Sequence, residues 1–197
     1  MTTPLRIGFA LTGSFCTFAT VLPVLEGLVA RGCMVTPILS THAGTLDTRF
    51  GAAGAWRRRL RESTGHAIID SIQAAEPIGP KKLFDVLVVA PCTGNTLAKL
   101  AHGITDTPVT MAVKSHLRSE RPVVLAVATN DALAGSAANL GVLFNRRHYY
   151  FVPLRQDAPS AKPRSLVADM SRLSDTVDAA LAGHQLQPML LAPVEGS

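Results

Sequence analysis

The chain has few cysteines and no long apolar run, and each absence excludes a class of protein. Its 197 residues contain three cysteines, Cys16, Cys33 and Cys92, with no CxxC spacing among them. This pattern is typical of a reducing compartment and excludes a disulfide scaffold and a cysteine-based zinc site. No apolar run approaches the roughly 20 residues that a membrane span needs. We therefore expect a cytoplasmic protein with no metal site, no membrane span and no signal peptide.

Aromatic and charged residues are also scarce. Aromatic residues make up 5% of the chain and charged residues 17%, whereas 47% is hydrophobic and the net charge is +5. Low aromatic content argues against nucleic-acid binding, and residues 57–61 supply much of the positive charge as one arginine cluster. The cluster is either a solvated helix face or a patch for a phosphate, an anionic substrate or a partner. The high apolar content predicts subunit interfaces, and we expect a homo-oligomer.

The chain is organised around residues 84–106. Residues 86–90 are apolar and include three valines, which is typical of a strand buried on both faces. Small polar residues follow at 91–96, and apolar residues then recur at helical spacing up to Ile104. Open α/β sheets bind ligands beyond the carboxyl ends of their strands, where helix N-termini present free N–H groups. The polar turn therefore either caps the helix or contributes to a binding site.

Four further apolar segments predict strands, at residues 5–11, 34–39, 123–128 and 149–153. Helical patterns separate them, among them residues 132–140, and a last amphipathic helix is expected over residues 165–183. The alternation predicts an α/β fold with a doubly wound parallel sheet of Rossmann-like or flavodoxin-like type. We expect a single domain over residues 1–183. Residues 184–197 are expected to form a C-terminal tail that lies over a neighbour or is mobile.

Polar turns follow four of the predicted strands, at residues 12–14, 40–41, 93–96 and 129–130. Parallel strands end at one edge of a sheet, so these turns predict a site for a phosphorylated, planar, largely neutral ligand. Neither a GxGxxG nor a Walker motif is present, so a dinucleotide or nucleoside triphosphate site is not indicated. His42 lies beside the second turn and is either a ligand contact or solvated.

Residues 90–106 match the pattern A-P-x-T-x-N-T-x-A-K-x-A-x-G-I-x-D at every fixed position. On this motif the chain resembles the homo-oligomeric flavin-containing decarboxylases. The resemblance implies that FMN binds between subunits of a trimer-based oligomer. The cofactor-binding residues that it implies are Gly13, Ser14 and Ser40 near the phosphate, Thr93, Asn95 and Thr96 near the flavin, and Thr129.

Two segments depart from the decarboxylase pattern. The active-site His-Ile pair of that family is replaced by Glu-Pro-Ile-Gly at residues 76–79, in a rigid loop that could lie against the ligand. The Pro-Ala-Met-Asn motif is replaced by Val-Ala-Thr-Asn at residues 127–130. Both departures argue against oxidative cysteine decarboxylation.

The loop at residues 75–82 and the segments at 126–133, 139–141, 149–157 and 162–170 resemble one branch of the family, the B subunits of the dipicolinate synthases of spore-forming bacteria. That resemblance implies a flavoprotein oxidoreductase acting with an NADP-binding A subunit in the cytoplasm of the sporulating mother cell. The pair would oxidise a dihydrodipicolinate-level intermediate to dipicolinate. The alternatives are a flavin-dependent decarboxylase or prenyltransferase of the same fold and a non-catalytic flavin-binding regulatory subunit.

A dicarboxylate substrate agrees with the basic net charge of the chain. The candidate anion partners are Lys114, Arg118, Arg146, Arg147 and Arg155. Arg146 and Arg147 precede a strand, where a solvated face is an equally good interpretation. The candidates for proton transfer are Glu76, His116 and His148, and the pattern does not choose among them.

Overall fold

A seven-stranded sheet forms the centre of the computed structural model, which describes residues 3–193. The strands are β1 (Arg6–Leu11), β2 (Met34–Leu39), β3 (Val86–Cys92), β4 (Val123–Thr129), β5 (Tyr149–Phe151), β6 (Leu154–Arg155) and β7 (Leu166–Ala168). The longer helices are α1 (Phe18–Ala30), α3 (Ala53–Thr64), α5 (Gly94–His102), α6 (Pro108–Leu117), α7 (Ala137–Phe144) and α8 (Leu173–Leu181). The short helical segments are η1 (Phe15–Thr17), α2 (Thr41–Thr45), α4 (Ile72–Ala75), η2 (Glu76–Ile78) and η3 (Met170–Arg172).

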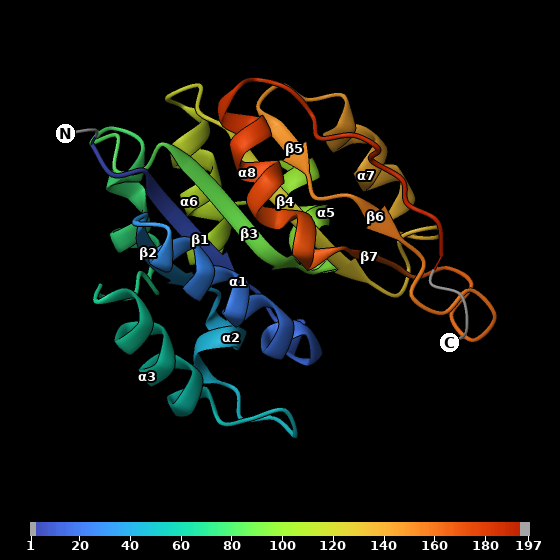
Figure 1. The fold of residues 1–197 in the computed structure, drawn as a ribbon, viewed down its shortest axis with the longest axis horizontal. Coiled ribbons are helices and arrows are strands. Elements are labelled where there is room, and N and C mark those ends of the chain that lie inside the picture. Colours follow the sequence, from blue (N-terminus) through green and yellow to red (C-terminus); the bar gives the residue numbers. More distant parts are fainter. Residues whose placement is uncertain (1–2, 194–197) are drawn as a thin grey trace.

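The five strands that the apolar segments predict pair in parallel in the order β2-β1-β3-β4-β5. This is the strand order of flavodoxin-like folds, so the predicted fold class is confirmed. All seven residues of β3 are buried, because helices cover both faces of the sheet. Helices α1 and α8 lie on one face, and α5 and α6 lie on the other (Figure 1). Among the described residues, no helix is long and apolar enough to cross a membrane.

Strand β3 is longer than the apolar run predicts. It continues through Pro91 and Cys92, which the sequence pattern assigns to the following turn. The register with β4 shifts between Val89 and Cys92, and such an irregularity accommodates a proline that has no N–H to donate. The polar turn therefore begins at Thr93, directly at the start of α5.

The C-terminal third of the domain differs most from the prediction. The helix expected at residues 132–140 begins only at Ala137, after a series of turns. The helix expected at residues 165–183 is instead β7, then η3, then α8. Strand β7 pairs antiparallel with both β4 and β6, so the sheet is mixed at this end. Asp169 ends the strand segment, because its carboxylate accepts the Ser171 N–H at 3.1 Å and opens η3.

Part of the predicted tail pairs with its own chain, as far as Leu191. The Leu154 N–H donates to the Met189 carbonyl, and the Leu191 N–H donates to the Leu154 carbonyl, both at 2.8 Å. The Gln185 side chain accepts from the Phe151 N–H and donates to its carbonyl, both at 2.7 Å. The last part of the predicted tail, residues 194–197, lies outside the described residues.

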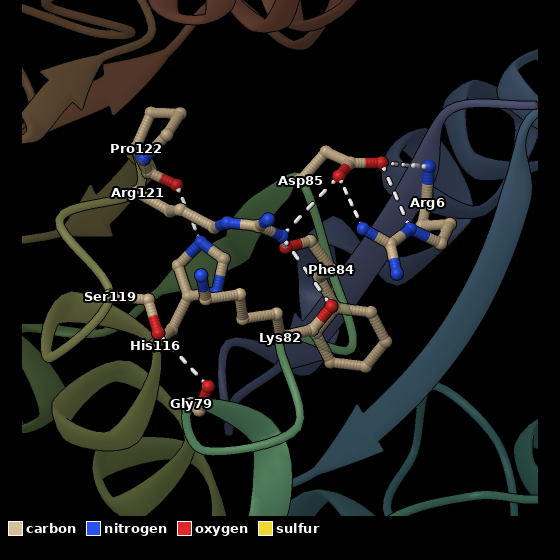
Figure 2. Close-up of polar contacts among 9 residues, drawn as sticks. All are labelled: Arg6, Gly79, Lys82, Phe84, Asp85, His116, Ser119, Arg121 and Pro122. Carbon is tan, nitrogen blue, oxygen red and sulfur yellow. Dashed lines mark hydrogen bonds and ion pairs between the residues drawn. The ribbon is translucent and has the colours of Figure 1, made fainter. Parts of the chain in front are cut away.

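An ion-pair cluster joins the amino ends of the central strands. The Asp85 carboxylate, just before β3, accepts from the Arg6 N–H at 3.0 Å and from its guanidinium at 2.6 Å. Arg121, just before β4, approaches the same carboxylate at 3.3 Å and also donates to the Phe84 carbonyl (Figure 2). The two guanidinium groups hold the pKa of Asp85 below its usual range. This cluster therefore fixes the amino edge of the sheet, opposite the polar turns.

Candidate functional site

A polar pocket of about 450 Å³ lies at the carboxyl ends of β1, β2 and β3. Its lining comes from three of the four predicted turns and from the segments around α5 and α6. The lining residues are Thr12, Gly13, Ser40, Thr41, His42, Thr93, Asn95, Thr96, Lys99, Asp106 and Thr107. We refer to this cavity as the polar pocket.

Thr12 joins the first turn to the turn after β3. Its hydroxyl donates to the Pro91 carbonyl at 2.7 Å and accepts the Thr93 N–H at 3.1 Å. The side chain is 1% exposed, so it has no second face with which to contact a ligand. Its role in the pocket is to hold the two turns in register.

The N-terminus of α5 faces the polar pocket. Thr93 caps the helix: its hydroxyl accepts the Thr96 N–H at 3.2 Å and donates to the Thr96 hydroxyl at 3.0 Å. The N–H groups of Gly94 and Asn95, in the first turn of the helix, have no intrahelical acceptor and remain available to an anion or an acceptor atom. The Asn95 side chain is exposed and hydrogen-bonds to no residue within 3–193. The arrangement provides backbone and amide donors with little charge.

Gly13 and Ser40 line the side of the pocket formed by β1 and β2. A β-carbon at Gly13 would lie 3.7 Å from the Phe15 ring and 4.0 Å from the His42 β-carbon, so the backbone stays open to a ligand. The Ser40 hydroxyl accepts the Ala43 N–H at 3.3 Å, and its own hydrogen remains free to donate. His42 is exposed and lines the pocket, which agrees with both of its interpretations, a ligand contact and a solvated side chain.

Five of the seven predicted cofactor-binding residues line the polar pocket, and two do not. The lining five are Gly13, Ser40, Thr93, Asn95 and Thr96. The Ser14 carbonyl instead accepts both the Thr17 N–H and its hydroxyl, at 3.1 and 2.7 Å. The Thr129 hydroxyl donates to Asp131 at 2.6 Å behind Gly94, where a β-carbon would lie 2.6 Å from that hydroxyl oxygen.

An ion pair in the pocket was not predicted. The Lys99 ammonium lies 2.8 Å from both carboxylate oxygens of Asp106. Lys99 and Asp106 are both fixed positions of the motif, and their opposite charges could have indicated from the sequence that they pair. The left-handed Gly103, with φ of +71°, ends α5 and turns the chain back toward Lys99.

The three candidates for proton transfer all lie outside the polar pocket. His116 lies near the amino ends of the strands, where its Nε2 donates to the Pro122 carbonyl at 3.1 Å (Figure 2). The side chain is 1% exposed, and burial lowers its pKa to about 4. A neutral, buried imidazole that donates to a backbone carbonyl stabilises the α6–β4 connection.

The backbones of Glu76 and His148 also make hydrogen bonds that stabilise the fold. The loop that begins at Glu76 is fastened to α6: the Ser115 hydroxyl donates to the Glu76 carbonyl at 2.5 Å and accepts the Gly79 N–H at 2.8 Å. Within the chain this loop therefore packs on α6 and does not line the polar pocket. His148 has φ of +68°, and its carbonyl accepts the Val123 N–H at 2.8 Å.

A second cavity, of about 370 Å³, gathers three of the five candidate anion partners. Lys114 and Arg118 reach it from α6, and Arg146 reaches it from the connection before β5. The other residues that line it are Lys99, Leu100, Gly103, Ile104, Thr105, Thr110, Val113, Leu117 and Tyr149. We refer to it as the cationic cleft. Arg147 does not line it, and Arg155 is ion-paired with Asp169.

The family model for flavoproteins matches residues 1–179 of the chain. The chain belongs to the flavoprotein family. It is 45% identical to the B subunit of dipicolinate synthase of Bacillus subtilis over 192 residues, which cover 98% of this chain and 96% of that protein. The subfamily resemblance that the motif and the C-terminal segments indicated is therefore confirmed. Among the residues 3–193, no group of three or more metal-ligating side chains is present.

Two solved structures place the fold. The crystal structure of the dipicolinate synthase B subunit from Bacillus halodurans superposes with a TM-score of 0.89 at 44% identity, covering 96% of this chain and 97% of that one. The FMN-dependent cysteine decarboxylase SpaF superposes with a TM-score of 0.62 at 25% identity, covering 90% of this chain and 95% of that one. The similarity to the synthase protein thus extends over nearly the whole chain, including the C-terminal segments.

Proposed function

We propose that this chain is the flavoprotein subunit of a dipicolinate synthase. It acts with an NADP-binding A subunit and oxidises a dihydrodipicolinate-level intermediate to dipicolinate, in the cytoplasm of a sporulating mother cell. The observation that carries the proposal is the polar pocket, because the family motif builds it at the switch point of a flavodoxin-like sheet. The end-to-end similarity to the B subunit of the Bacillus subtilis synthase supports the choice of reaction.

The residues of the polar pocket fit FMN. Gly13 and Ser40 would hold the phosphate, since the glycine leaves the backbone open and the serine hydroxyl has a hydrogen to donate. Thr93, Asn95 and Thr96 would lie along the flavin, where the free N–H groups of α5 and the Asn95 amide suit a largely neutral ring. When bound, the flavin would supply two-electron redox chemistry. The protein would bind the cofactor as part of a homo-oligomer.

The decarboxylase alternative is disfavoured by the residues at two places. Residues 76–79, which stand where the decarboxylase pattern has its His-Ile pair, contain no histidine, and their loop is fixed on α6 by Ser115. Thr129, in the segment that replaces the Pro-Ala-Met-Asn motif, is hydrogen-bonded to Asp131. The regulatory alternative predicts instead that flavin binding is dispensable for turnover.

The test is dipicolinate formation followed by ultraviolet absorbance, with each of the two subunits alone and with both together. We expect turnover only with both subunits, and loss of turnover when Gly13→Asp prevents FMN binding. Full activity of either one alone would contradict the two-subunit requirement. Full activity of a flavin-free variant would contradict the redox role and favour a regulatory subunit.

A further inference from the structure

We propose that the cationic cleft is a binding site for a small planar dicarboxylate. The choice of ligand class rests on the proposed function, whereas the cleft itself is formed entirely by residues of one chain. The cleft lies between the C-terminal part of α5, one face of α6 and the start of β5. Its volume of about 370 Å³ falls within the range of small-molecule sites.

Two cations in the cleft are free to bind a ligand. Lys114 lies in the last turn of α6, and Arg118, four residues later, is the C-cap residue and keeps helical backbone angles, so the two side chains project from the same face; both are exposed. Neither has an ion pair or a side-chain hydrogen bond within residues 3–193. Two neighbouring unpaired cations match a ligand with two negative charges, and a guanidinium can bind a carboxylate through two parallel hydrogen bonds.

The other two cations are held in place by the protein. The Arg146 guanidinium donates to the carbonyl oxygens of Leu100 and Ala101, at 3.1 and 2.6 Å, and so caps the C-terminus of α5. Lys99 is paired with Asp106, which lines the polar pocket and not the cleft. The residues that line the cleft include no carboxylate, so its field is positive.

The walls of the cleft suit a ring. Leu100, Val113 and Leu117 provide apolar surface, and the Tyr149 side chain lies beside them. Burial raises the pKa of Tyr149 to about 12, so its hydroxyl stays protonated and can donate a hydrogen bond. An apolar wall with cations at its rim binds an aromatic dicarboxylate better than a hydrated inorganic anion, because only the former gains from covering that wall.

Lys99 lines both the cleft and the polar pocket. A dicarboxylate in the cleft would therefore bind next to the proposed FMN site, with the Lys99–Asp106 pair between the two cavities. The cleft could then hold the substrate or the product of the same subunit.

The test is calorimetric titration of the full chain, equilibrated with FMN, using pyridine-2,6-dicarboxylate and benzene-1,3-dicarboxylate. The second probe has the same carboxylate spacing but does not chelate metal ions in a three-point site. We expect both to bind, and the double variant Lys114→Gln/Arg118→Gln to weaken both about tenfold or more. Arg58→Gln is the matched control, because this exposed arginine lies on α3, away from the cleft, and its loss should leave both affinities unchanged.

Ile104→Glu is a second variant that does not depend on the first. Ile104 lines the cleft and is 46% exposed, so a carboxylate there should repel the ligand with little effect on folding. The proposal is overturned if neither probe binds the wild type, if inorganic phosphate binds as tightly as the dicarboxylates, or if the double variant and Ile104→Glu keep wild-type affinity.

Flavin retention separates the two proposals. A double variant that keeps FMN but loses the dicarboxylate supports the cleft assignment. A wild-type protein that binds the dicarboxylate through Lys114 and Arg118 but never retains FMN supports the cleft and contradicts the flavoprotein role.

Discussion

The Thr12 hydroxyl accepts the N–H of Thr93 at 3.1 Å, across the carboxyl ends of two neighbouring strands. Replacing Thr12 by valine keeps the shape of the side chain but leaves the Thr93 N–H and the Pro91 carbonyl without their partner. Since the site is buried, we expect a loss of about 1–3 kcal/mol in the free energy of unfolding. Urea unfolding measures this loss. Thr12→Ser keeps the hydroxyl and is the control for loss of the methyl group, and wild-type stability of Thr12→Val would show that the bond contributes nothing.

Gly13→Asp should abolish FMN binding. The substitution places a carboxylate in the polar pocket, where like charge would repel the cofactor phosphate. The backbone leaves space for the new side chain, so the protein should still fold. Gly54→Asp is the matched control, because nothing lies within 4 Å of a β-carbon there and the site is on α3. Stoichiometric FMN in the purified Gly13→Asp protein would place the phosphate elsewhere.

Asn95→Ala should weaken FMN binding about tenfold while changing the free energy of unfolding by less than about 0.5 kcal/mol. The side chain is exposed in the pocket and its amide bonds to no residue that the structure describes, so only a ligand would lose a contact. Fluorescence titration with FMN measures the first quantity, and urea unfolding measures the second. Unchanged affinity would remove Asn95 from the proposed site.

His116 should make the protein less stable in mild acid. Its pKa is lowered to about 4 in the folded chain, whereas an unfolded histidine titrates near 6.5. Between these values the unfolded chain takes up a proton that the folded chain does not, so stability falls as the pH drops from about 6.5 to 4. The loss is at most about 3 kcal/mol. His116→Gln should remove this part of the pH profile; a profile identical to that of the wild type would show that the imidazole does not titrate on unfolding.

Asp85→Asn should destabilise the fold by about 1–3 kcal/mol, because two guanidinium groups would lose their carboxylate at the amino edge of the sheet. The control is Asp178→Asn, which removes an ion pair to Arg31 between side chains about half exposed, and which should cost less than about 1 kcal/mol. Thermal unfolding of both variants gives the comparison. Equal shifts in the two variants would mean that the Asp85 cluster is no stronger than a surface pair.

The parallel part of the fold was predictable because its signals are local. Residues 86–90 form an uninterrupted apolar run, and a strand buried on both faces needs that composition. The turns after these strands were predictable as a pocket for the same reason, since parallel strands end at one edge. The motif at residues 90–106, through its resemblance to flavin-containing decarboxylases, predicted that this pocket binds flavin.

The antiparallel part of the sheet could not be predicted, because its strands form only through pairing with residues far away in the sequence. Leu166, Val167 and Ala168 are three consecutive apolar residues, a run too short to distinguish a strand from a helix, and only pairing with β4 and β6 makes them a strand. The same limit applies to the charged residues. Arg155 forms an ion pair with Asp169 and is not available to a ligand. Arg146 lines the same cavity as Lys114 and Arg118 because segments far apart in the chain pack together.

The most direct test of the flavoprotein role is an absorbance scan of the purified chain, before and after incubation with FMN and removal of the excess. We expect the protein to retain the near-ultraviolet and visible bands of oxidised flavin at about one FMN per chain. A colourless protein that does not retain FMN would contradict the assignment of the polar pocket to a flavin.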